Sequence, residues 1–123
     1  EALEHYRQML QGMYARGITP LVTLHHFSDP LWLAEQGGWE NEAAIGHYVR
    51  FVEKVVGALK EYATLWCTFN EPNVYATMGY VLGDFPPGRV GDVPAAGRVL
   101  LHMVRAHAAA YAAIHRLLNT ARV

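Results

Sequence analysis

Apolar residues recur with helical spacing in three stretches of the chain, and two short apolar runs lie between them. The helical stretches cover residues 2–16, 42–62 and 94–118, and each has one apolar stripe. The runs at 18–25 and 65–70 are rich in β-branched and aromatic residues, which is typical of buried strands. Two buried strands joined by a helix predict a parallel βαβ crossover, in the order helix, strand, helix, strand, helix.

The segments between these elements are rich in turn residues. Residues 26–41 predict a long loop, in which a short helix begins at Pro30, continues to Glu35 and is ended by two glycines. Residues 81–93 predict an ordered loop. We expect both strands to be covered on both faces, yet two strands cannot close a sheet, and a complete eight-stranded barrel needs about 250 residues. The chain is therefore expected to be a piece of a larger barrel or sheet.

Composition excludes several classes of function. The chain has 123 residues, of which 52% are hydrophobic, and this excludes general disorder. Its net charge of −1 provides no basic face, so neither nucleic acid nor a membrane surface is expected as a partner. The only cysteine, Cys67, lies inside the second predicted strand and is expected to be a buried, inert thiol. A reducing compartment fits this cysteine content, and we expect a cytoplasmic protein.

Polar residues follow both predicted strands at their carboxyl ends. The second strand stops at Asn70, and Glu71 and Pro72 follow at once. A carboxylate in this place can face a ligand, because active sites of α/β proteins form at this edge of the sheet. The same residues also fit a helix start with Asn70 as its cap and Pro72 in the first turn. Both interpretations remain open.

The first strand ends at two histidines, and parallel pairing places its end beside Asn70 and Glu71. His26 and Asn70 can bind hydroxyl groups, while Glu71 can hold or donate a proton, so the group suits a polyol substrate. His25 and His26 also suggest a metal site, but consecutive strand residues point to opposite faces, so no metal ligand set is expected.

Other polar and aromatic residues permit a structural interpretation. His102 and His107 do not share a helix face and are interpreted as packing residues. Trp39, Tyr75 and Tyr80 could border a ligand or only pack, and both interpretations stay open. Arg89 follows Pro-Pro-Gly in a loop and is expected to be solvated.

Several longer motifs occur in a fixed order along the chain. Residues 17–27 read GITPLVTLHHF, residues 37–41 read GGWEN, and residues 66–72 read WCTFNEP. Residues 85–88 read FPPG, and residues 106–108 read AHA. These motifs resemble those of the family 1 glycoside hydrolases, the retaining β-glycosidases that include β-glucosidases. The corresponding family motifs read G-I-x-P-x-V-T-L-Y-H-W, G-G-W-x-N and W-x-T-F-N-E-P.

The resemblance implies an α/β fold, a partial TIM (β/α)₈ barrel. Residues 1–123 would form a single segment around barrel strands 3 and 4, truncated at both ends. It also implies hydrolysis of β-D-glucosides or related β-glycosides at the non-reducing end, by a retaining mechanism without cofactor or metal. Glu71 would be the catalytic acid/base, Asn70 would bind the sugar 2-hydroxyl, and His26 would bind a neighbouring hydroxyl.

The chain departs from the family motifs in two respects. Phe27 stands where a tryptophan is usual, and Ser28-Asp29 replaces Asp-Leu, so the shape of the sugar site stays open. The nucleophile of the family lies in a Glu-Asn-Gly context that does not occur here. A retaining pair needs a second carboxyl roughly 5 Å from the first, so we expect the isolated fragment to be inactive.

Two alternatives differ from this interpretation. Another barrel glycosidase, of the endo-cellulase or xylanase type, also places Asn-Glu after its fourth strand, but the GGWEN and FPPG loops argue against it. A non-catalytic carbohydrate-binding fragment stays open, because the nucleophile is not in the chain. The sugar preferred at the site, the aglycone and the oligomeric state are not determined by these residues.

Overall fold

The computed structural model describes all of residues 1–123, and the five predicted elements occur in the predicted order. The long helices are α1 (Ala2–Tyr14), α3 (Ala43–Leu59) and α5 (Val93–Leu117), and the strands are β1 (Leu21–His25) and β2 (Leu65–Phe69). Shorter elements are α2 (Leu31–Glu35), the 3₁₀ helix η1 (Gly38–Glu40), α4 (Pro72–Thr77) and the π-helix η2 (Met78–Leu82). The predicted short helix after Pro30 is thus confirmed. Helix α4 corresponds to the helix start that was left open at Pro72, whereas η2 was not predicted.

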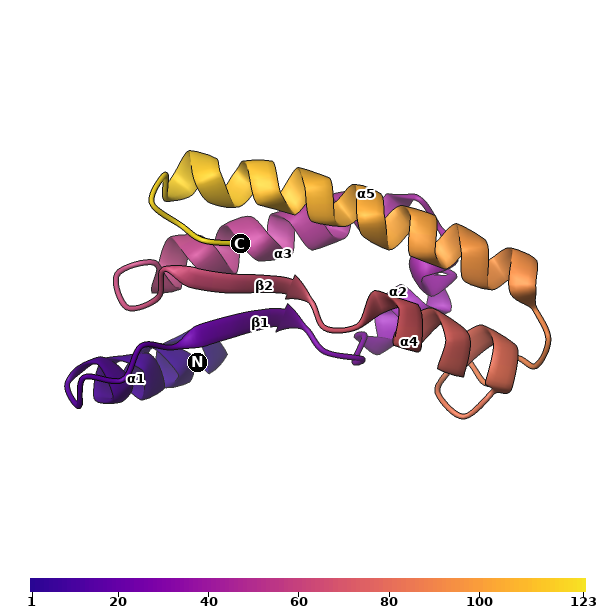
Figure 1. Ribbon diagram of the computed structural model, residues 1–123, viewed down its shortest axis with the longest axis horizontal. Coiled ribbons are helices and arrows are strands. Elements are labelled where there is room, and N and C mark those ends of the chain that lie inside the picture. Colours follow the sequence, from indigo (N-terminus) through magenta and orange to yellow (C-terminus); the bar gives the residue numbers. More distant parts are fainter.

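The two strands form a parallel sheet, as the crossover predicted. Residues Leu21, Val22, Thr23 and His25 pair with Leu65, Trp66, Cys67 and Phe69. On its other edge β2 pairs in parallel with Arg122, whose carbonyl accepts a hydrogen bond from the Trp66 N–H at 2.9 Å. Both strand arrows point toward the end of the molecule where α2 and α4 lie (Figure 1).

The helices cover one face of this sheet. Helix α3 packs against both α1 and α5, and α5 also contacts β2 (Figure 1). The largest fully buried side chains are Trp39, Trp66, Met103, Ile114, Val52, Val56 and Val99. Such burial contributes roughly 1.5–3 kcal/mol for each large apolar side chain. None of the helices is both long and apolar enough to cross a membrane.

The expectation that both strands are covered on both faces is wrong for these residues. Val22 and Leu24 pack against the core, but Leu21 and Thr23, which alternate with them, are exposed. Successive side chains of a strand point to opposite faces of the sheet, and the helices of this segment cover only one of these faces. The prediction for Cys67 is also only partly met, because this residue is half-buried, with its thiol 3.3 Å from the Phe69 carbonyl.

Candidate functional site at the carboxyl ends of the strands

The segments that follow β1 and β2 are joined directly by their backbones. The N–H of Asn70 donates to the carbonyl of His25 at 2.9 Å. This bond extends the parallel pairing one residue beyond β2 and places His26, Asn70 and Glu71 at the same edge of the sheet. The predicted convergence of the two strand ends is therefore confirmed.

Glu71 has an unusual backbone conformation. Its φ of 43° and ψ of 61° lie in the left-handed region, which costs a residue with a side chain roughly 1–3 kcal/mol. The residue is the N-cap of α4, and Pro72 follows in the first turn. Both interpretations of this segment are thus correct in part: a strand ends here and a helix begins, but the cap is Glu71 rather than Asn70.

The Glu71 side chain does not serve the helix that it precedes. It makes no capping hydrogen bond and is exposed at the strand edge. Its backbone is fixed instead, because the carbonyl of Glu71 accepts a hydrogen bond from the Tyr75 N–H at 3.1 Å. A carboxyl on a fixed backbone with a free side chain can exchange protons with a bound molecule.

The two histidines after β1 have different surroundings. His26 is exposed, whereas His25 is buried and its ring lies against Trp39, Phe69 and Tyr75. This difference in exposure agrees with the expectation that the two consecutive side chains point to opposite faces. No group of three His, Cys, Asp or Glu side chains in the chain is arranged to hold a metal ion.

Asp29 is the residue at this edge that sequence reasoning did not recognise. Its Oδ1 accepts hydrogen bonds from His25 Nε2 at 3.1 Å and Trp39 Nε1 at 3.0 Å. Its Oδ2 accepts a hydrogen bond from the Tyr75 hydroxyl at 2.6 Å. The only signal in the sequence was an acid four residues beyond a strand end, since two of the three donors lie 10 and 46 positions away.

These contacts shift the pKa values of Asp29 and Tyr75. Burial alone would raise the pKa of Asp29, but hydrogen bonds from His25, Tyr75 and Trp39 outweigh it, and the pKa is lowered. Burial, and then the Asp29 carboxylate, raise the pKa of the Tyr75 hydroxyl. Tyr75 therefore stays protonated and Asp29 ionised at neutral pH, as their hydrogen bond requires.

The remaining candidates have structural roles within the chain. The carbonyl of Trp39 accepts a hydrogen bond from His102 at 2.8 Å, and Trp39 itself is only 1% exposed. The prediction that Arg89 is solvated is met only in part, because the side chain is exposed but also ion-paired. Its guanidinium pairs with Glu40 at 2.7 Å and Asp92 at 3.1 Å, because the loop folds back over η1.

The family model "Glycosyl hydrolase family 1" matches residues 1–123. The chain belongs to glycosyl hydrolase family 1. It is 37% identical to a 6-phospho-beta-galactosidase from Clostridium acetobutylicum, over 88% of this chain and 23% of that protein.

Solved structures of family 1 members agree with the fold. A beta-glycosidase from Pyrococcus horikoshii superposes with a TM-score of 0.88 at 41% identity, over 94% of this chain and 27% of that one. A beta-glucosidase from Thermotoga maritima in complex with deoxynojirimycin superposes with a TM-score of 0.93 at 28% identity, over 98% of this chain and 27% of that one. The predicted fold class is confirmed: the segment is part of a (β/α)₈ barrel. It spans about a quarter of the length of these relatives.

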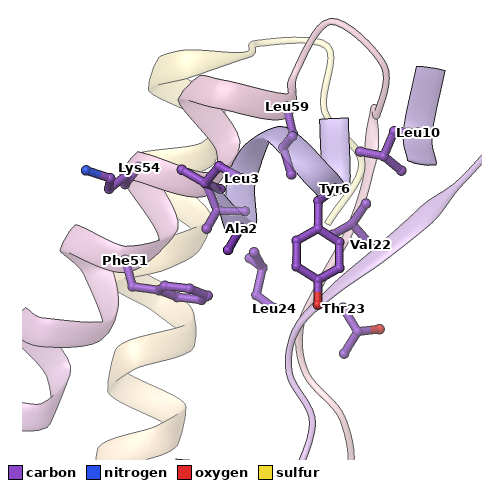
Figure 2. A pocket seen from close by; sticks show the side chains of 11 residues that line it. Ala2, Leu3, Tyr6, Leu10, Val22, Thr23, Leu24, Phe51, Lys54 and Leu59 are labelled. Atoms are coloured by element: carbon purple, nitrogen blue, oxygen red, sulfur yellow. The ribbon is translucent and has the colours of Figure 1, made fainter. Parts of the chain in front are cut away.

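Among the hollows of the family 1 segment, two differ clearly in their lining. One, of about 400 Å³, lies between the loops after β1, α2 and η2, and its charged side chains are Asp29, Glu40 and Arg89. The other, of about 450 Å³, lies between α1, β1 and α3. Its lining is almost wholly apolar, and Figure 2 shows the Lys54 ammonium pointing away from it. His26, Asn70 and Glu71 line neither hollow.

Proposed function

We propose that the full-length protein hydrolyses β-glycosides by a retaining mechanism in which this segment supplies the acid/base. The proposal rests chiefly on one observation: the Asn70 N–H donates to the His25 carbonyl, and this bond joins the two backbone segments that carry His26, Asn70 and Glu71. Membership of family 1 supports it, and so does the deoxynojirimycin complex of the Thermotoga maritima relative. The substrate is a small β-glycoside or an oligosaccharide.

Each of the three residues has a defined part in the proposed reaction. Protonated Glu71 donates its proton to the glycosidic oxygen as the bond to the aglycone breaks. A second carboxylate, supplied from outside residues 1–123, forms the glycosyl ester. Glu71 then accepts a proton from the water that attacks this ester and is restored to its protonated form. Asn70 binds the sugar 2-hydroxyl, where a bond that strengthens in the transition state contributes several kcal/mol. His26 binds a neighbouring hydroxyl.

The exposure of Glu71 in this segment is compatible with that reaction. A general acid acts best in a site from which water is excluded, and exclusion raises the pKa of a carboxyl toward the working pH. We propose that later parts of the barrel close over the open face of the sheet and provide this environment. The isolated segment, which lacks the second carboxyl, is then expected to show no turnover of aryl β-glucosides.

The test uses the full-length protein and the substitution Glu71→Gln. General acid/base catalysis contributes about 10² to 10⁴ in rate, so substrates with poor leaving groups such as cellobiose should slow by that factor. An activated aryl glucoside needs little protonation, so its glycosylation step should change much less. Added azide should then accelerate turnover of the activated substrate, because this anion attacks the glycosyl ester without base assistance.

Glu61→Gln is the matched control, because Glu61 is an exposed acid in the turn after α3. It should leave both substrates unaffected. Unchanged cellobiose hydrolysis by Glu71→Gln would contradict the assigned role. Sugar binding with no turnover by the unaltered full-length protein would favour the carbohydrate-binding alternative. Parallel assays with glucosides and 6-phosphogalactosides would identify the sugar, since relatives of both names occur.

A further inference from the structure

The carboxylate of Asp29 connects the two residues whose backbones hold the predicted catalytic pair. His25 donates to it through Nε2, and the carbonyl of His25 accepts the N–H of Asn70. Tyr75 donates to it through its hydroxyl, and the N–H of Tyr75 binds the carbonyl of Glu71. The Asp29 side chain therefore holds both His25, which hydrogen-bonds to the backbone of Asn70, and Tyr75, which hydrogen-bonds to the backbone of Glu71.

We propose that Asp29 is a positioning residue for proton transfer, which fixes the orientation of Glu71 through His25 and Tyr75. The inference rests on the proposed function of Glu71. Asp29 itself touches neither the sugar nor the reacting atoms in the proposed reaction. Its action is on the backbone that determines where the Glu71 carboxyl points.

Glu71 needs such support because its backbone is strained. A left-handed conformation persists in a residue with a side chain only where its surroundings hold it. The Tyr75 N–H provides one restraint on the Glu71 carbonyl, and Tyr75 is itself held at the far end of its side chain, 2.6 Å from Asp29. Loss of that anchor lets the first turn of α4 shift and allows Glu71 to relax.

A carboxylate suits this place better than any neutral residue. The Asp29 side chain is only 12% exposed and accepts from three donors on three separate segments. An asparagine has one acceptor oxygen, and its NH₂ group would face at least one of these donors. The lowered pKa of Asp29 agrees with a permanently ionised group. Asp29 is also the only hydrogen-bond partner of the His25 ring, since the other ring nitrogen, Nδ1, is buried without a partner.

The experiment compares Asp29→Asn with the unaltered full-length protein on a series of aryl β-glucosides with leaving groups of increasing pKa. Misplacement of a catalytic group by about 1 Å can cost on the order of 10²-fold in rate. We expect kcat/KM for poor leaving groups to fall roughly 10- to 100-fold more than for activated ones, so that the dependence on leaving-group pKa becomes steeper. A purely structural role would reduce all substrates by one common factor, because it lowers only the fraction of folded protein.

Tyr75→Phe provides a second variant, which removes a single hydroxyl and leaves the ring in place. The dependence of its kcat/KM on leaving-group pKa should also become steeper, but by less. If Asp29→Asn does not fold, Tyr75→Phe alone tests the positioning role of Asp29. Asp84→Asn is the control, because Asp84 is an exposed acid in the loop after η2 and should change neither rate nor slope.

The outcomes separate this inference from the function on which it rests. A steeper dependence in Glu71→Gln, Asp29→Asn and Tyr75→Phe supports both. If Glu71→Gln steepens the dependence while the other two lower all rates equally or not at all, Asp29 is structural and the inference is overturned. If Glu71→Gln leaves the dependence unchanged, the proposed function is wrong and the inference falls with it.

Discussion

The hydroxyl of Thr68 and the Nδ1 of His107 lie 2.7 Å apart, and this contact joins β2 to α5. Thr68 is 5% exposed, whereas His107 is exposed and can exchange its partner for water. The AHA motif at residues 106–108 thus includes a histidine that connects α5 to β2, the strand directly before Asn70. The Thr68 hydroxyl is buried and the His107 ring is exposed, so loss of either hydrogen-bond partner has a different consequence for the other.

Substitutions at these two positions should therefore have unequal effects on the full-length protein. His107→Ala leaves a buried hydroxyl without a partner and should lower the free energy of unfolding by about 1–3 kcal/mol. Thr68→Val removes the hydroxyl itself and should cost about 1 kcal/mol or less, because water satisfies the histidine. Urea unfolding of both variants and of the double variant checks this. The double variant should lose less than the sum of the two, and strict additivity would contradict the coupling.

Gly79 should not tolerate a side chain, because the loop of residues 85–88 packs directly on it. A Cβ at this position would lie 2.8 Å from the Pro86 carbonyl oxygen, and backbone must move to accommodate it. Gly79→Ala should cost about 1–3 kcal/mol in urea unfolding. Gly57, inside α3, has open space where a methyl group would lie, so Gly57→Ala should stabilise by about 0.5–1 kcal/mol. Equal effects of the two substitutions would refute this distinction.

The ionisation of Asp29 should make stability depend on pH in the acidic range. Its pKa is lower in the folded protein than its ordinary value of 3.8, so the unfolded chain binds its proton first as pH falls. The stabilisation is complete above that value and is lost as pH falls through the folded pKa. The stability difference between the unaltered protein and Asp29→Asn should be about 1.5–3 kcal/mol at pH 7.

Unfolding measurements between pH 7 and pH 3 provide the check. The stability difference should stay constant down to about pH 5 and shrink below pH 4. A difference that grows toward low pH would mean that the folded state raises the Asp29 pKa instead. The exposed Asp84→Asn variant corrects for a general change in net charge.

Arg89 should hold the loop of residues 83–92 against the rest of the segment. Besides its two ion pairs, its guanidinium lies 5.5 Å from the centre of the Tyr80 ring. Arg89→Gln should speed hydrogen exchange at the backbone amides of residues 89, 91 and 92, which donate to carbonyls of η2. Global stability should change little, because exposed ion pairs contribute little.

Amide exchange resolved by residue measures this effect directly. Arg50→Gln serves as the control, since Arg50 is exposed on α3 and bonds only to His47. Unchanged protection of the three loop amides in Arg89→Gln would mean that backbone bonds alone hold the loop.

Apolar periodicity predicted the three long helices, and short apolar runs rich in β-branched and aromatic residues predicted the two strands. Periodicity did not predict α4 and η2, which are short and have no full repeat. The segment at Asn70 and Glu71 gave two valid local signals, a strand end and a helix start. The backbone satisfies both, because Glu71 adopts a left-handed conformation that lets one element follow the other without a loop.

The sequence by itself determined the family, through the order of its motifs, and the parallel strands, through the helix between them. It also determined which residues follow each strand, because all of these depend on residues close together in the sequence. Only the packing of the elements decided which side chains meet. Asp29 receives donors from 4, 10 and 46 positions away, and Arg89 reaches Glu40 across a folded loop. Such pairs have no local pattern, because the distance between distant residues depends on how whole elements lie against each other.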